Sequence, residues 1–89
     1  LLGQLDKLET LLLLDLSRTG IDDADLAHVA AHRELVDLDL SHNPITDEGL
    51  AQLHGLERLR YLNLTNTEVT VEGVDALQAA VPRLEIADD

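Results

Sequence analysis

The 89-residue chain contains no cysteine, and Tyr61 is its only aromatic residue. Without cysteine, disulfide bonds and thiolate metal sites are excluded. Hydrophobic residues still make up 45% of the sequence, so leucine, isoleucine, valine and alanine must form nearly all of the core. No apolar run approaches the roughly 20 residues that span a bilayer, and direct membrane insertion is therefore not expected.

Basic residues are also scarce. The chain has 6 lysines and arginines against 18 acidic residues, which gives a formal net charge of −12. Nucleic acids must be held through clustered basic side chains that contact phosphates, so we predict no nucleic-acid partner. A protein partner with a basic patch, or a metal ion, remains electrostatically possible.

One spacing of apolar residues occurs three times, in copies that begin 24 residues apart. The copies are Leu11-x-x-Leu14-x-Leu16-x-x-Thr19-x-Ile21, Leu35-x-x-Leu38-x-Leu40-x-x-Asn43-x-Ile45 and Leu59-x-x-Leu62-x-Leu64-x-x-Thr67-x-Val69. A truncated fourth copy follows as Val81-x-x-Leu84-x-Ile86. Repetition at a fixed period of this length is the signature of a solenoid, in which each repeat buries its apolar face against its neighbours.

The second copy shows the order of elements within a repeat. Apolar and polar residues alternate over residues 38–40, which predicts a short strand, and residues 41–44 are typical of a turn. Apolar residues at helical spacing follow. The helix caps predicted for the three repeats are Asp22 (paired with Asp25), Thr46 or Asp47, and Thr70.

We therefore predict an α/β solenoid with one sheet of parallel strands, about 4.8 Å apart, and helices on the outer side. The chain is expected to be a single domain, residues 1–89. Its predicted parts are a partial-repeat helix at residues 1–10, full repeats at residues 11–34, 35–58 and 59–80, and a terminal strand at residues 81–89.

The three copies resemble the leucine-rich repeat family across essentially the whole chain. Residues 45–50 and 69–74 are similar to the short bacterial subtype, with repeats of roughly 24 residues that run T-x-V-T-D-x-G-L. Residues 73–86 resemble the closing repeat of such arrays, so we expect the C-terminal part of a larger protein. The resemblance implies a curved solenoid with a concave sheet and convex helices, and an asparagine-ladder role for Asn43. It also implies protein recognition without catalytic residues or a cofactor.

Exposed strand positions are expected to form rows across the concave face. We predict one row of Leu13, Asp37, Tyr61 and Arg83, and a second of Asp15, Asp39, Asn63 and Glu85. The acidic centre of this face predicts docking of a basic protein partner, with Tyr61 as the best anchor. The predicted protein-binding residues are Asp15, Asp37, Asp39, Tyr61, Asn63 and Arg83. An exposed strand face needs polar residues in any case, so a structural spacer or C-terminal cap of a larger protein, without its own ligand, fits the same pattern.

The first strand presents a different feature. Leu12 and Leu13 fall at positions that should face solvent, on an open sheet edge that proteins normally cover. We predict a contact there with an earlier repeat, a preceding domain or a second copy of the chain.

Other chemistries are weaker interpretations. Neighbouring carboxylates on adjacent strands have the spacing of a retaining glycosidase pair, but such enzymes need a cleft and usually aromatic platforms. His28 and His32 are four residues apart on a helix, the spacing for a shared metal. The run from Asp22 to Asp25 lacks the spacing of an EF-hand loop, and capping explains its acids. We predict no catalytic, metal or cofactor residues, and a protein that is not an enzyme.

Overall fold

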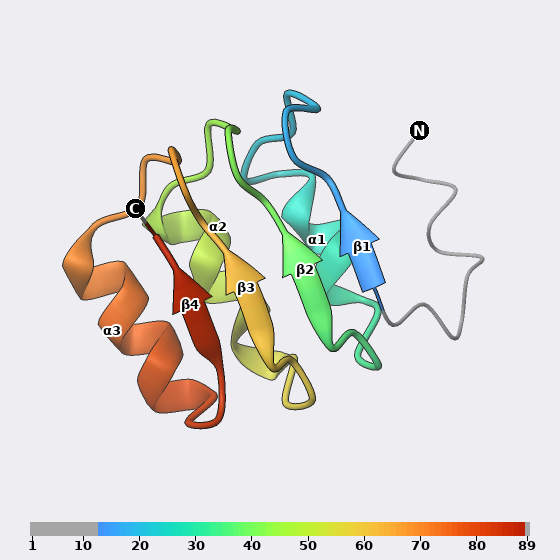
Figure 1. The fold of residues 1–89 in the computed structure, drawn as a ribbon, viewed down its shortest axis with the longest axis vertical. Helices are drawn as coiled ribbons and strands as arrows, with labels where there is room; N and C mark the ends of the chain where they lie inside the picture. Colours follow the sequence, from blue (N-terminus) through green and yellow to red (C-terminus); the bar gives the residue numbers. More distant parts are fainter. Residues whose placement is uncertain (1–12, 89) are drawn as a thin grey trace.

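The computed structural model describes residues 13–88. Their backbone forms one sheet of four parallel strands, which lie in the order β1-β2-β3-β4. Figure 1 shows the strands side by side, from β1 at the right to β4 at the left. The strands are β1 (Leu13–Asp15), β2 (Asp37–Asp39), β3 (Tyr61–Asn63) and β4 (Glu85–Ala87).

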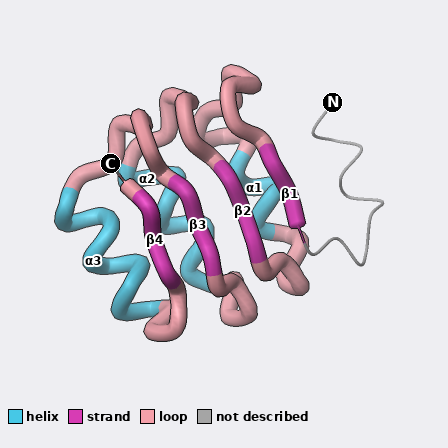
Figure 2. The backbone as a smooth tube through the Cα atoms, in the orientation of Figure 1, coloured by secondary structure: helices cyan, strands magenta, loops and turns pink. Residues whose placement is uncertain are grey.

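Helices cover one face of this sheet, and within residues 13–88 none covers the other face (Figure 2). They are α1 (Leu26–Ala30), α2 (Asp47–Ala51), its 3-10 continuation η2 (Gln52–Gly55) and α3 (Val71–Ala80). The predicted α/β fold, with one parallel sheet and helices on its outer side, is confirmed.

Two predicted cap residues, Thr46 and Thr70, bind the first turns of their helices. They accept hydrogen bonds from the N–H groups of Glu48 and Gly73, each at 3.3 Å. The prediction of Asp22 as a helix cap is wrong, because α1 begins after Asp25, which makes no side-chain cap hydrogen bond. Asp22 and Asp25 bind each other: each carboxylate accepts from the other residue's N–H, at 3.1 and 3.3 Å. This reciprocal pair closes the turn of residues 22–25 that leads into α1.

The core lies between the sheet and the helices, and the buried apolar side chains of residues 13–88 are all aliphatic. Tyr61 stays outside it, 48% exposed. The second repeat is the most completely buried, whereas Leu14, Val69 and Val74 of its neighbours are only partly buried. Its fully buried side chains are Leu35, Leu38, Leu40, Ile45, Leu50, Leu53 and Leu56.

Asn43 is buried among these side chains and connects two repeats. Its Nδ2 donates to the carbonyl oxygens of Leu16 (2.9 Å) and Leu40 (3.1 Å), and its Oδ1 accepts from the N–H of Gly20 at 2.8 Å. Thr67, in the same place one repeat later, donates only to the carbonyl of Leu64. The ladder role that the resemblance implies is thus present at Asn43 and reduced where threonine replaces it.

A second polar contact joins neighbouring repeats at the start of the helices. Asp23 accepts hydrogen bonds from the N–H (2.8 Å) and the hydroxyl of Thr46. One repeat later, Asp47 accepts the same two bonds from Thr70. Each threonine therefore caps its own helix and also binds the preceding repeat.

Glycine makes room for these aspartates. A Cβ atom on Gly49 would overlap Asp23 Oδ1 and lie 2.8 Å from Leu26 Cδ1, and one on Gly73 would overlap Asp47 Oδ1. The recurring Thr-x-x-Gly spacing of the sequence therefore has a physical cause: a helix start and the acceptor of the preceding repeat meet at this point.

The alignment of Val81-x-x-Leu84-x-Ile86 with the start of the third repeat is wrong. Ile86 pairs with Leu62, and Glu85 pairs with Tyr61. The strand therefore keeps the 24-residue period, and Arg83 does not belong to the row of Tyr61. Arg83 lies instead in the turn before β4.

The cause of this error is that the L-x-x-L spacing occurs twice in each repeat. Val81 takes the place of Leu56 and Leu84 that of Leu59, as the hydrogen bond from the N–H of Leu84 to the carbonyl of Val81 shows, since Leu59 donates to Leu56 in the same way. Val81 and Leu84 each follow their counterparts by 25 residues, so the stretch from Leu84 into β4 is one residue shorter than that from Leu59 into β3. Both Val81 and Leu84 are buried. Spacing of apolar residues alone does not distinguish these two alignments.

Two expectations, the helix at residues 1–10 and the contact at Leu12, lie outside the described residues.

Replacing Asn43 should cost more than replacing the matching threonine. Asn43→Ala leaves buried carbonyl and N–H groups unpaired, so we expect the free energy of unfolding to fall by about 3 kcal/mol, against about 1 kcal/mol for Thr67→Ala. Urea denaturation at pH 7 measures both values. Asn43→Thr should lie between them, and equal losses for the two alanine variants would contradict the bridging role.

Gly49→Ala should destabilise the fold although alanine is the better helix former. Overlap with Asp23 is expected to cost about 2 kcal/mol, again measured by urea denaturation. Gly55→Ala is the matched control, because nothing lies within 4 Å of its Cβ position. Unfolding of both variants at the same urea concentration would contradict the expected overlap between a Cβ atom at residue 49 and Asp23.

Candidate functional site

The free face of the sheet carries a row of exposed side chains, one from each strand. Leu13 pairs with Asp37, Asp37 with Tyr61, and Tyr61 with Glu85. Leu13 is 66% exposed and Tyr61 48%. This first row therefore places an acid between an aliphatic and an aromatic side chain, at strand spacing of about 4.8 Å.

Asp37 is the centre of the first row. Within residues 13–88 its carboxylate makes no hydrogen bond or ion pair. Two shallow hollows of the surface meet at Asp37. One, of about 370 Å³, is lined by Leu13, Leu14, Asp15 and Asp39 as well, and the other, of about 320 Å³, by Tyr61, Asn63 and Glu85 among others.

The side chains of the second row form hydrogen bonds within the fold. The row consists of Asp15, Asp39 and Asn63. Asp15 Oδ1 accepts from the N–H of Ser17 at 2.9 Å, Asp39 Oδ1 does the same with Ser41, and Asn63 Oδ1 with Thr65. These are Asx turns, which turn the chain out of each strand. The fourth member is Ala87, which pairs with Asn63, rather than the predicted Glu85.

The turn also changes the acidity of Asp15. The Ser17 hydroxyl, 2.7 Å from Asp15 Oδ1, lowers the pKa of the Asp15 carboxyl, and the Ser17 N–H lowers it further. Hydrogen bonds to a carboxylate favour its charged form. Asp15 therefore carries its negative charge at neutral pH.

Next to the second row, the chain enters the left-handed region at the same position of three successive repeats. Arg18, His42 and Asn66 have φ values of 56°, 60° and 57°. Asn66 Nδ2 and His42 Nδ1 are 3.0 Å apart across the two repeats. This backbone shape costs about 1 kcal/mol for a residue other than glycine or asparagine, so these turns are held by the stacking of the repeats.

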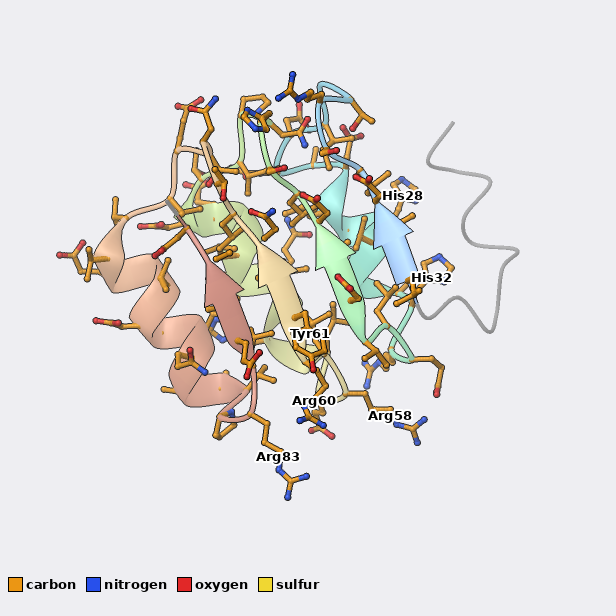
Figure 3. The ribbon with its side chains drawn as sticks, in the orientation of Figure 1. His28, His32, Arg58, Arg60, Tyr61 and Arg83 are labelled. Carbon is orange, nitrogen blue, oxygen red and sulfur yellow. The ribbon has the colours of Figure 1, made fainter. Side chains whose placement is uncertain are left out.

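The two histidines of the first repeat differ in exposure. His28 is exposed, whereas His32 is buried and its Nε2 has no hydrogen-bond partner. His32 stands where the next repeat has Leu56, as its backbone hydrogen bond with Leu35 shows. Figure 3 shows both side chains near β1. Among residues 13–88, no three metal-ligating side chains come together.

The aspartates of residues 22–25 form hydrogen bonds within the fold. Asp22 and Asp25 bind each other, and Asp23 binds Thr46. Their placement follows from the turn that leads into α1 and from repeat stacking.

The structure thus separates the predicted binding residues into three groups. Asp37 and Tyr61 are neighbours in the first row, together with Leu13, as the predicted row has them. Asp15, Asp39 and Asn63 lie beside them but end the strands. Arg83 is outside both rows, and Glu85 takes its place. The sequence signal for the Asx turns is the spacing Asp/Asn-x-Ser/Thr, and that for Glu85 is its distance of 24 residues from Tyr61.

Four parallel strands backed by helices at a constant period define a short solenoid of α/β repeats. The sequence profile of the leucine-rich repeat family matches residues 32–53 and 58–77. The chain therefore contains leucine-rich repeat units over residues 32–77. Such repeats generally serve as protein-interaction modules and are usually not catalytic. A search of curated proteins found no match.

No helix within residues 13–88 has the length and apolar character required to cross a membrane.

Ser17→Ala should raise the pKa of the Asp15 carboxyl towards its ordinary value. A carboxyl whose pKa is lowered by folding stabilises the protein above its unfolded pKa, about 3.9. That stabilisation is lost as the pH falls through the lower folded pKa. A ¹³C NMR titration of the Asp15 carboxyl in both proteins tests this, and identical curves would show that the Ser17 hydroxyl has no effect.

Proposed function

We propose that this chain is a non-enzymatic protein-interaction module whose free sheet face binds an extended, basic segment of a partner protein. The observation that carries the proposal is the first row, in which the unpaired Asp37 stands between Leu13 and Tyr61. The exposed aliphatic and aromatic surfaces and the free carboxylate lie within one side-chain length of each other.

This arrangement suits a lysine or arginine side chain. The aliphatic stem of such a side chain packs on apolar surface while its charged end remains polar. Leu13 and Tyr61 offer that surface on both sides of Asp37, and a tyrosine ring also attracts a cation over its face. Tyrosine is also enriched among the residues that dominate binding energy at interfaces.

The charge of the chain supports the same partner chemistry. Asp15, Asp37, Asp39 and Glu85 all lie on the free face, in a protein with a net charge of −12. Such a field speeds the encounter with a positively charged segment and disfavours negatively charged ones.

We also infer the short bacterial subtype for these repeats. The inference is supported by the two Asp–Thr contacts and the glycines that admit them, since they account for the Thr-Asp-x-Gly segment of the subtype.

A structural role, as a spacer or cap within a larger protein, is the second candidate. It is favoured by the Asx turns, which give Asp15, Asp39 and Asn63 a task in the fold without any ligand. It does not explain the exposed row of Leu13, Asp37 and Tyr61. The two candidates differ at Asp37: binding of a basic segment requires its free carboxylate, whereas the structural role does not.

The test uses a short peptide that alternates arginine with serine, so that every second side chain faces the sheet. We expect saturable chemical-shift changes at the first row in ¹⁵N NMR spectra. The double variant Asp37→Asn, Tyr61→Ala should bind at least about tenfold more weakly, a loss of about 1.4 kcal/mol.

The matched control is Glu72→Gln with Val71→Ala on α3, where Val71 is 72% exposed. It removes the same charge and a comparable exposed apolar group from the helical side, and should leave binding unchanged. Equal weakening by both double variants would indicate attraction to net charge alone, and unchanged binding in the sheet variant would favour the structural role.

A further inference from the structure

Positive charge is concentrated at one edge of this acidic molecule. Of the five arginines in residues 13–88, four lie in the loops that precede strands, whereas 13 of the 15 acidic residues lie elsewhere. We call these four residues the arginine edge: Arg33, Arg58, Arg60 and Arg83. Figure 3 shows Arg58, Arg60 and Arg83 projecting past the ends at which the strands begin.

Arg33, Arg60 and Arg83 are the members of the arginine edge that are available to a ligand. Of these, Arg60 and Arg83 lie nearest to the first row along the chain. Arg58 forms an ion pair with Glu34 of the preceding repeat. Arg60 and Arg83 make no ion pair within residues 13–88, and both are exposed. Acidic residues outnumber arginines three to one in this part of the chain. Within it, Arg60 and Arg83 therefore lack a carboxylate partner because of where they lie, not because acids are scarce.

The backbone holds Arg60 firmly in place. Its N–H donates to the carbonyl of Val36 at 2.8 Å, and its carbonyl accepts from the N–H of Glu85 at 2.8 Å. It therefore bonds to both neighbouring strands. A side chain on a fixed backbone loses less freedom on binding, which favours affinity.

The arginine edge adjoins the first row directly. Arg60 precedes Tyr61 in sequence, and Arg83 is two residues before Glu85, the partner of Tyr61 across the strands. A segment that lies along the strands over Asp37 and Tyr61 and continues past their starts reaches the end of the sheet at which Arg60 and Arg83 project (Figure 3).

We propose that the partner segment is bipolar: basic side chains over Asp37 are followed, at the strand starts, by carboxylate side chains that bind Arg60 and Arg83. This inference rests on the proposed function and adds the charge order and orientation of the partner. Guanidinium groups bind carboxylates through paired hydrogen bonds. A wholly basic segment is repelled at the arginine edge and a wholly acidic one at the sheet, so the surface selects against both.

The experiment compares two peptides with the same arginine–serine stretch. One ends in two glutamates and the other in two glutamines. Attraction to a protein of net charge −12 predicts weaker binding of the glutamate peptide, because that peptide is less positive. The bipolar arrangement predicts the opposite, with the glutamate peptide bound about fivefold more tightly in calorimetric titrations at 150 mM salt.

The double variant Arg60→Gln, Arg83→Gln should abolish or reverse this preference. Its control is Arg18→Gln with Arg58→Gln, which removes the same charge from the opposite rim and from a residue already paired with Glu34; the preference should persist. Circular dichroism spectra should be recorded to check that each variant is folded.

Each outcome separates the two proposals. Equal or weaker binding of the glutamate peptide by the native chain overturns the bipolar partner, while the proposed function stands if Asp37→Asn still weakens the glutamine peptide. A preference that survives in the Arg60, Arg83 variant also overturns it. If Asp37→Asn affects neither peptide, or neither peptide binds, both proposals fall.

Discussion

A single repeat of this chain cannot bury its leucines alone; it buries them against the same leucines of its neighbour. Leu38, for example, pairs with Leu14 on one side and Leu62 on the other. That mutual burial requires every repeat to place its apolar residues at the same height, which explains the constant period of 24. It also lines up whatever stands on the opposite side of each strand. The exposed rows are therefore a consequence of the core.

Polar contacts between repeats keep that register where apolar packing does not reach. Asn43 binds the turn of the preceding repeat, and Thr46 and Thr70 bind Asp23 and Asp47 at the helix starts. These groups are fully used by the fold. The same holds for Asp15 and Asp39, whose carboxylates close the turns after the strands. An acidic residue on the sheet is thus a candidate for binding only if its carboxylate is not already hydrogen-bonded within the fold. Of Asp15, Asp37 and Asp39, only Asp37 meets this condition.

The distribution of charge follows the two ends of the strands. Acids gather on the sheet and on the helical side, whereas arginines gather in the loops before the strands. The arginines and the acids of residues 13–88 are all exposed or half-buried, so burial does not require them to lie in different places. The result is a surface with a negative face and a positive border, in which the order of charges in a bound segment matters as much as their number.

The sequence by itself determined the period, the order of strand, turn and helix, the aliphatic core and the two threonine caps. All of these depend on spacing along one stretch of chain. It placed Asp37 and Tyr61 side by side for the same reason. Only the tertiary structure decided that Glu85 rather than Arg83 continues their row, because L-x-x-L recurs within a repeat and only strand pairing selects the alignment. It alone also distinguished the free Asp37 from the bonded Asp15 and Asp39, since the spacing Asp-x-Ser permits an Asx turn but only the folded backbone brings donor and acceptor together.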